Sequence, residues 1–393
     1  MGGSLTTFAR VARDSGLPWA CALAAHRVLP FGILRLWRAR TVPAARLASQ
    51  VESIFRGWGM PDAHIAVTVE KMLYADLRGI DSHGCCMLPF YRQLLAEGVL
   101  NPAASIETVR EDGTTALIDG GGGLGHVAGS AAMDKAIALC RATGVGAVAV
   151  RNSGHYGAAG AYARMASDQG LIGIAMTSTP TPAVVPTFAR APLLGTNPIA
   201  IAVPGAGRRP FLLDMATSTV SRGRLVERWR SGRRVPRGWA VDRAGRPTRS
   251  VRRAGRDRLL APLGGTPDAS SYKGYGLAVA VEMLSVILPG IPARVAGTAR
   301  RARVGHFFLA LDPGRFRDRV PFFEDVAGLI DALHAAEPAD PRRPVLVAGD
   351  PEQAHFEARS RGGIPLARTV FEDLRALAIQ VRVPFVLEEA PAS

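Results

Sequence analysis

Short apolar runs alternate with helix-like stretches through the middle of the chain, and this pattern restricts the fold more than any other feature. Runs at residues 115–118, 146–150 and 172–176 are strand-like, and the stretches 129–141 and 158–168 between them are helix-like. Strands that alternate with helices are typical of a sheet with helical crossovers. The sequence therefore predicts an α/β domain here.

The segment before this domain has the periodicity of helices. Apolar residues recur at helical spacing over residues 42–78, with a break at 57–61, which predicts two amphipathic helices. A third helical stretch covers residues 88–97. His83 therefore lies on a loop between two predicted helices.

The second half of the chain is less regular. Residues 222–270 are rich in Gly, Pro and Arg, which predicts a long surface loop with little regular structure. A helix is predicted over 275–288. Strands are predicted at 306–310 and 344–347, on either side of a helical stretch at 326–336.

The chain is basic, with a formal net charge of +15, but arginine scattered along the whole length supplies the excess. Its densest run, residues 222–258, carries no signature of a nucleic-acid-binding module, so we expect no nucleic-acid partner. We also expect no membrane partner, because no segment reaches the roughly 18 apolar residues of a membrane helix.

The cysteine pattern bears on metal binding and on location. Four cysteines, Cys21, Cys85, Cys86 and Cys140, form no pair at zinc-ligand spacing. We therefore expect no metal site, and a reducing cytoplasm fits these residues best.

Two of the eight histidines stand out by context. His155 follows the predicted strand that ends at Val150, and α/β proteins bind ligands at the carboxyl ends of their strands. His83 lies in a small loop beside Asp81 and Gly84. Histidine suits proton exchange near neutral pH, as hydride transfer at a carbinol carbon requires. Taken singly, a structural role remains the favoured interpretation of each histidine.

Two glycine-rich stretches could approach a nucleotide. Gly120, Gly122 and Gly125 match the dinucleotide fingerprint between a predicted strand and a predicted helix. The next strand, however, carries no acidic residue at its end to bind a ribose, so a plain helix-entry turn remains an alternative. Lys273, among glycines before a helix, could meet a phosphate or a carboxylate, or belong to an ordinary helix-start loop.

An ordered set of segments resembles the type 2 malate/L-lactate dehydrogenase family. That family includes ureidoglycolate, sulfolactate and diketogulonate oxidoreductases and a cyclic-imine carboxylate reductase. The matching segments are residues 81–84, 154–159, 194–198, 213–218, 238–240 and 272–274, followed by 304–310. The resemblance implies an α/β fold distinct from the Rossmann dehydrogenases, with a mainly helical N-terminal part, bound NAD or NADP, and a homodimer. The fingerprint at residues 120–125 would then be a coincidence.

The resemblance also implies roles for individual residues. The acid/base histidine of the family falls on His155, and a second active-site histidine falls on His83. The implied cofactor contacts are Thr179, Asp214, Met215, Ala216, Lys273, Gly274, Gly349, Asp350 and Pro351.

Three positions depart from the family pattern, and the first of them concerns the substrate. Met87 stands where many members carry an arginine suited to clamp a carboxylate. Arg224 replaces a lysine after Gly223, and Ser178 replaces an asparagine before a segment that lacks an acidic residue near Pro180. These departures leave the identity of the acid open.

The sequence predicts four parts and one leading activity. The parts are a poorly ordered extension at 1–41, a helical part at 42–115, a central cofactor-binding α/β domain at 116–295, and a C-terminal α/β segment at 296–393 that packs back on the core. The activity is NAD(P)-dependent hydride transfer at C2 of a small 2-hydroxy or 2-oxo acid, or a related imino acid. The alternatives are a degenerate member without turnover, favoured by Met87, and an RNA-binding insertion at 222–258.

Overall fold

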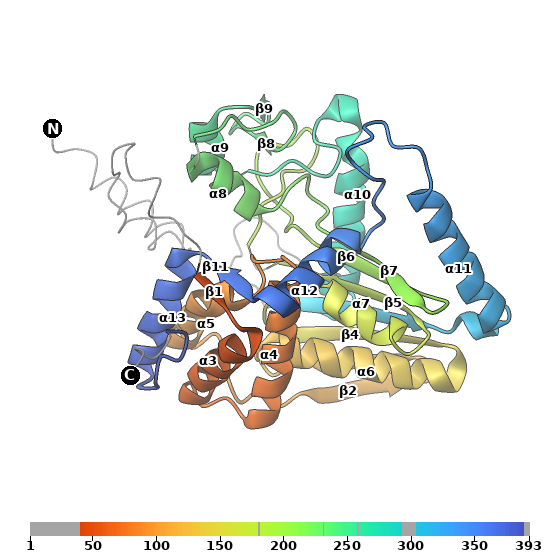
Figure 1. Ribbon diagram of the computed structural model, residues 1–393, viewed down its shortest axis with the longest axis horizontal. Helices are drawn as coiled ribbons and strands as arrows, with labels where there is room; N and C mark the ends of the chain where they lie inside the picture. The colour runs from red at the N-terminus through yellow and green to blue at the C-terminus, as the bar shows by residue number, and fades with distance from the viewer. Residues whose placement is uncertain (1–39, 180, 231, 258, 293–303, 389–393) are drawn as a thin grey trace. The chain divides into compact units, whose positions relative to one another are not determined.

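The computed structural model describes residues 40–388, except residues 180, 231, 258 and 293–303 (Figure 1). The chain forms two compact units. The first combines residues up to Ala103 with residues from Ala354 onward, and the second is Ala104–Gln353. An extension was predicted at residues 1–41, and residues 1–39 of it lie outside the part of the chain that the structure describes.

The first unit is mainly helical. The two predicted amphipathic helices are confirmed as α3 and α4, and they bury apolar residues such as Leu47 and Ile54. A two-stranded antiparallel sheet joins β1 to β11. The bounds are β1 Arg40–Val42, α3 Ala44–Gly57, α4 Asp62–Leu77, α5 Leu88–Ala96, α12 Asp350–Gly362 with its first turn in the second unit, β11 Ile364–Leu366 and α13 Arg368–Gln380.

The second unit is built on a seven-stranded sheet with the order β2-β3-β4-β10-β5-β6-β7. Strands β3 and β4 run parallel, and the other described neighbours run antiparallel. The predicted central strands are confirmed. The bounds are β2 Glu107–Asp112, β3 Thr115–Asp119, β4 Val145–Ser153, β5 Ile172–Thr177, β6 Ile199–Gly205, β7 Arg208–Met215 and β10 Val304–Leu311.

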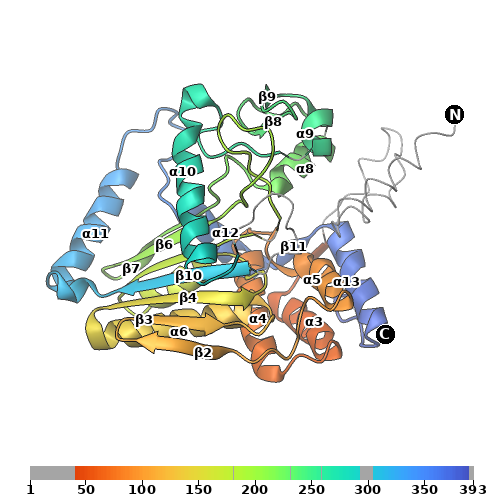
Figure 2. The ribbon, with the colours of Figure 1, turned by 180° about the vertical axis from the view of Figure 1, so that it is seen from behind.

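Helices pack on both faces of this sheet. Helix α6 (Gly125–Thr143) connects β3 to β4, and α7 (Gly160–Ser167) connects β4 to β5, in front of the sheet in Figure 1. Helix α10 (Ser271–Glu282) continues into a π-helical segment, Met283–Ile287, that packs against β10. Figure 2 shows β10 and α10 from the opposite side. The carboxyl ends of β4 and β7 carry the candidate site.

The prediction of a long surface loop with little regular structure over 222–270 is wrong. Helices α8 (Arg222–Arg230) and α9 (Val251–Asp257) form there, as do the short strands β8 (Ala240–Val241) and β9 (Pro247–Thr248). Leu225, Val235, Ala254 and Leu260 are buried in one apolar cluster. Such burial stabilises short elements that propensity alone does not support.

The end of the second unit also differs from the prediction. Residues 344–347 form no strand, so that expectation is wrong. Helix α11 spans Arg319–His334 and begins earlier than predicted. Strand β10 is confirmed, and it lies between β4 and β5 in the sheet.

Candidate functional site

His155 lies in the loop that follows β4, in the second unit. The backbone N–H of Gly157 faces its Nδ1 at 3.4 Å, a long hydrogen bond. The side chain is partly buried. Because Nδ1 accepts from the backbone of its own loop, the neutral ring carries its hydrogen on Nε2. A proton exchanged with a substrate would therefore pass through Nε2.

A buried aromatic stack holds the base of this loop. Tyr156 stacks on the ring of His306 at 4.6 Å and on Tyr162 at 4.7 Å. The ring nitrogens of His306 face Ser153 Oγ at 2.9 Å and Thr177 Oγ1 at 2.6 Å. Burial lowers the pKa of His306 to about 3, so this imidazole is neutral at physiological pH. His306 therefore works as a structural bridge between β4, β5 and β10.

A third imidazole adjoins His155. His126, in the first turn of α6, is fully buried, and its ring lies edge-on to His155 with 6.4 Å between centroids. The sequence analysis missed His126 and His306. A signal was present, because His126 directly follows the glycine-rich stretch and His306 lies in a segment that carries the family resemblance.

Asp214, near the end of β7, lies at the end of the His155 loop where helix α7 begins. Its Oδ2 accepts a hydrogen bond of 2.8 Å from the N–H of Gly160, the first residue of α7. Burial raises the pKa of this carboxyl to about 6, although the Gly160 bond works in the opposite direction. Met215 and Ala216 follow directly. The structure thus joins two of the predicted segments, 154–159 and 213–218, within one unit.

The glycine-rich stretch at 120–125 contacts its own chain. Backbone N–H groups of Gly120, Gly122 and Gly125 donate, in that order, to the carbonyls of Arg151, Asn152 and His155, over 2.9, 2.8 and 3.0 Å. A phosphate would need these same donors. The helix-entry turn is therefore the interpretation that the hydrogen bonds support.

The other predicted cofactor residues lie in the second unit, each with a local structural role. Thr179 Oγ1 accepts from the N–H of Thr196 at 3.2 Å. Gly274 packs where a Cβ would meet the Leu263 carbonyl at 2.3 Å, and its neighbour Lys273 is exposed.

The turn into α12 is made by Gly349 with Asp350 and Pro351, the first two residues of the helix. Gly349 has φ +102°, which favours glycine. Asp350 accepts from the N–H of Val347 at 2.8 Å and pairs with His334 at 2.7 Å. The turn is thus fixed by its own hydrogen bonds.

Arg222 carries an orphaned buried polar atom. Its Nη2 donates to the Pro182 carbonyl at 2.7 Å, while its buried Nε has no partner among the described residues. Burial lowers the pKa of this guanidinium to about 10. Burying a cation with so few partners costs folding free energy unless an anion binds to it.

His83 lies in the first unit, between α4 and α5. Its Nδ1 faces Ser82 Oγ at 2.8 Å, and desolvation lowers the pKa of the ring to about 4. The buried Asp76 carboxyl accepts from the N–H of Cys85 at 2.8 Å. A Cβ on Gly84 would clash with Asp76 Oδ1 at 1.9 Å, so a glycine is needed there. Met87 ends the short turn that follows.

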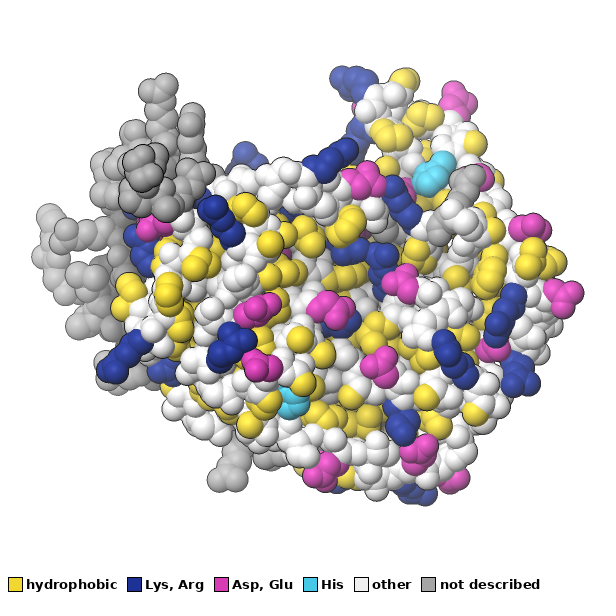
Figure 3. Space-filling model, turned by 60° about the horizontal axis from the view of Figure 1, so that its bottom comes forward, with side chains coloured by type: hydrophobic (Ala, Val, Ile, Leu, Met, Phe, Trp, Pro, Cys, Tyr) yellow, Lys and Arg dark blue, Asp and Glu magenta, His cyan; other side chains and the backbone are white. Residues whose placement is uncertain are grey.

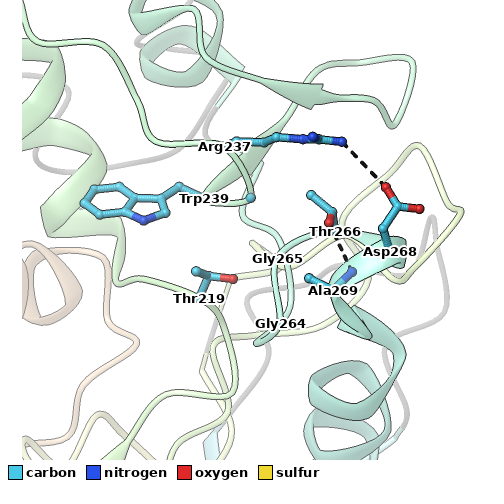
Figure 4. A pocket seen from close by; sticks show the side chains of 9 residues that line it. Thr219, Arg237, Trp239, Gly264, Gly265, Thr266, Asp268 and Ala269 are labelled. Atoms are coloured by element: carbon cyan, nitrogen blue, oxygen red, sulfur yellow. Dashed lines mark hydrogen bonds and ion pairs between the residues drawn. The ribbon is translucent and has the colours of Figure 1, made fainter. Parts of the chain in front are cut away.

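A shallow surface pocket of about 410 Å³ lies in the second unit (Figure 4). Trp239 and the backbone of Gly238 and Gly265 line it. Arg237 and Asp268 form an exposed ion pair at its rim, with 3.6 Å between their charged atoms. The pocket contains part of the segment 238–240, which carries the family resemblance.

The described residues show neither a cluster of metal ligands nor a helix long and apolar enough to cross a membrane. On the face shown in Figure 3, arginines are interspersed with acidic side chains. Such mixing differs from the single-sign stripe of a nucleic-acid-binding surface.

Comparisons with known proteins agree on one family. The family model for malate/L-lactate dehydrogenase matches residues 42–375. A malate dehydrogenase of Pyrococcus horikoshii is 38% identical over 346 residues, which cover 87% of this chain and 96% of that protein. An L-sulfolactate dehydrogenase of Methanocaldococcus jannaschii is 37% identical over 82% of this chain and 92% of its own length.

A solved structure supports the fold. The crystal structure of malate dehydrogenase from Entamoeba histolytica matches with a TM-score of 0.83 and 30% identity, over 88% of this chain and 99% of that one. The predicted non-Rossmann α/β fold is thereby confirmed.

Proposed function

This chain belongs to the malate/L-lactate dehydrogenase family, and from that premise we propose that it is an NAD(P)-dependent oxidoreductase acting at C2 of a small 2-hydroxy or 2-oxo acid. A related imino acid is a further candidate substrate. The observation that carries the proposal is the loop after β4, which holds the partly buried imidazole of His155 and is bound at its far end, through the N–H of Gly160, by Asp214 of β7. The family resemblance predicted from the motifs is confirmed.

The residues of the second unit fit a nicotinamide dinucleotide chemically. Lys273 and Arg222 offer cations for phosphate groups, and the orphaned Nε of Arg222 is the group that such an anion would complete. Thr179, Asp214, Met215, Ala216, Gly274, Gly349, Asp350 and Pro351 are the other proposed contacts. When bound, the cofactor supplies or accepts the hydride.

His155 handles the proton in this proposal. In the reductive direction it donates from Nε2 to the oxygen or imine nitrogen on C2, and in the oxidative direction it accepts that proton. His83 keeps the assisting role that the resemblance assigns to it, and its low pKa favours a neutral ring that can share a hydrogen bond. Met87 contributes an apolar side chain, so another group must bind the substrate carboxylate.

Absorbance of NADH and NADPH tests the proposal. We expect oxidation of one of them with a panel of 2-oxo acids and cyclic imino acids. Nucleotide binding without turnover of any panel member would instead support a degenerate family member, the alternative that Met87 favours.

We also propose that the working protein is a homodimer. Helix α11 buries little of its apolar surface, since Val320 is 66% exposed and Leu329 is 63% exposed. Exposed apolar patches of this kind mark interaction surfaces. Sedimentation of the wild-type chain should give a dimer, and Leu329→Lys should weaken it, whereas a monomer at micromolar concentration contradicts the proposal.

The cytoplasm is the compartment that we propose. Cys85, Cys86 and Cys140 are free thiols in the described structure, as a reducing environment would keep them.

A further inference from the structure

Asp119 ends strand β3 and uses both carboxylate oxygens on the segment that leads to His155. Its Oδ1 accepts from Asn152 Nδ2 at 2.7 Å and from the N–H of Gly121 at 3.0 Å. Its Oδ2 accepts from Arg151 Nε at 3.0 Å. Partial burial opposes ionisation, but these donors outweigh it and lower the pKa of the carboxyl below its usual value. Asp119 is therefore an ionised acceptor at neutral pH.

Backbone hydrogen bonds of the glycine-rich stretch extend the contact between Asp119 and the segment before His155. Gly120 and Gly122 donate to the carbonyls of Arg151 and Asn152, and Gly125 then donates to the carbonyl of His155 itself. Residues 119–125 are thus joined to residues 151–155 by five hydrogen bonds, two to the Asp119 side chain and three between backbone groups. The last of them ends on the proposed acid/base residue.

The local geometry explains why both segments need such support. Asn152 has φ +52°, a left-handed conformation that costs a non-glycine residue energy. The two segments also approach closely, because a Cβ on Gly125 would lie 2.4 Å from the Gly154 carbonyl. The conformation before His155 is therefore held by its partners.

We propose that Asp119, together with the glycine-rich stretch 120–125, is a positioning device for His155. The inference rests on the proposed function and names what fixes the proton-transfer group. Asp119 is linked to His155 through Arg151, Asn152 and the glycine backbone, so it acts on the reaction by orientation. Misplacement of a catalytic group by about 1 Å can cost on the order of a hundredfold in rate.

The test compares Asp119→Ala and Asp119→Asn with Asp112→Ala. Asp112 is an exposed residue at the other end of the same hairpin and serves as the matched control. We expect kcat to fall roughly 10- to 100-fold in Asp119→Ala, with the Kd of NAD(P)H within about threefold of wild type. Asp119→Asn should lie in between, because its amide oxygen still accepts from Gly121 and Asn152 but its amide nitrogen cannot accept from Arg151.

A second pair of variants tests the backbone part. Gly125→Ala introduces the clash with Gly154, whereas Gly362→Ala, at the exposed end of α12, adds a Cβ with no atom within 4 Å. We expect a loss of kcat in the first and none in the second. Hydrogen exchange in peptides covering 119–125 should rise in Asp119→Ala.

The outcomes separate this inference from the proposed function. A wild-type protein that binds nucleotide but turns over no substrate contradicts the proposed function and needs no variant. An active wild type whose Asp119→Ala variant keeps kcat within twofold overturns the positioning role. A parallel loss of kcat, nucleotide affinity and thermal stability in both Asp119 variants also overturns it, because a merely structural residue would give that result.

Discussion

The loops of His83 and His155 are both held by an aspartate, but the two carboxyls are in opposite electrostatic states. Asp76, beneath the His83 loop, is almost fully buried, and burial raises its pKa to about 7. Asp119, beside the His155 loop, has a lowered pKa because three donors meet its two oxygens. The same residue type therefore anchors one loop as a carboxyl that titrates near neutral pH and the other as a carboxylate that is ionised at neutral pH.

The difference in pKa follows from how deeply each carboxyl is buried and from the number of donors that meet it. Asp76 is almost fully buried and accepts from the backbone N–H of Cys85, while Arg359 binds Asp81 and the Asp76 carbonyl. Desolvation therefore dominates at Asp76, while hydrogen bonding dominates at Asp119. The attachment of the His83 loop should depend on pH near neutrality, and that of the His155 loop should not.

The largest expected effect separates the two histidines themselves. His155→Ala should lower kcat by about a hundredfold or more, the usual scale for losing a general acid or base. His83→Ala should cost less, because an assisting hydrogen bond is lost while the proton-transfer group remains. Steady-state kinetics of both variants decides between them. If His155→Ala keeps its activity within a few fold of wild type, His83 becomes the preferred proton donor.

The next effect concerns pH and Asp76. Between pH 4 and 7 the folded protein keeps the Asp76 proton that the unfolded chain has lost, so stability falls as the pH rises through this window. From pH 5 to pH 8 the wild type should lose roughly 2 kcal/mol relative to Asp76→Asn, since each pKa unit is worth about 1.4 kcal/mol. Urea unfolding at the two pH values measures the difference.

Asp119→Asn is the matched control for that measurement. Its carboxyl has a pKa below the ordinary value, so its contribution is complete above that value and is lost only at lower pH. The variant should therefore keep the wild-type slope between pH 5 and pH 8. Equal slopes for wild type and Asp76→Asn would show that Asp76 is already ionised at pH 5.

The helices and strands around both loops could be predicted because their apolar residues follow a clear period. Over residues 42–176 the predicted helices and strands form, since buried positions such as Leu47 and Val148 recur at regular spacing. Residues 222–270 escaped prediction because small buried residues, such as Ala254, are spaced among arginines. Tertiary packing stabilises the helices and strands of this segment, and its apolar residues follow no local period that would predict them.

The candidate site was only partly visible in the sequence. The motifs named His83, His155 and Asp214, but Asp76 and Asp119 lie outside them. Asp119 had a local signal, since an aspartate two residues before a left-handed Gly121 is typical of a side chain that bonds its own turn. The contact of residues 119–125 with 151–155 is non-local, and a single sequence does not reveal it.

The smallest effect compares Arg359, which pairs with Asp81 near His83, with Arg151, which pairs with Asp119. Arg359 is 10% exposed and also donates to the Asp76 carbonyl, whereas Arg151 is 42% exposed. Arg359→Ala leaves a buried acceptor without its donor and should cost about 2 kcal/mol of unfolding free energy. Arg151→Ala removes an exposed pair and should cost less than about 1 kcal/mol. Urea titrations at pH 7 measure the unfolding free energy of both variants. Equal losses of unfolding free energy would mean that the burial of Arg359 gives it no larger contribution than the exposed Arg151.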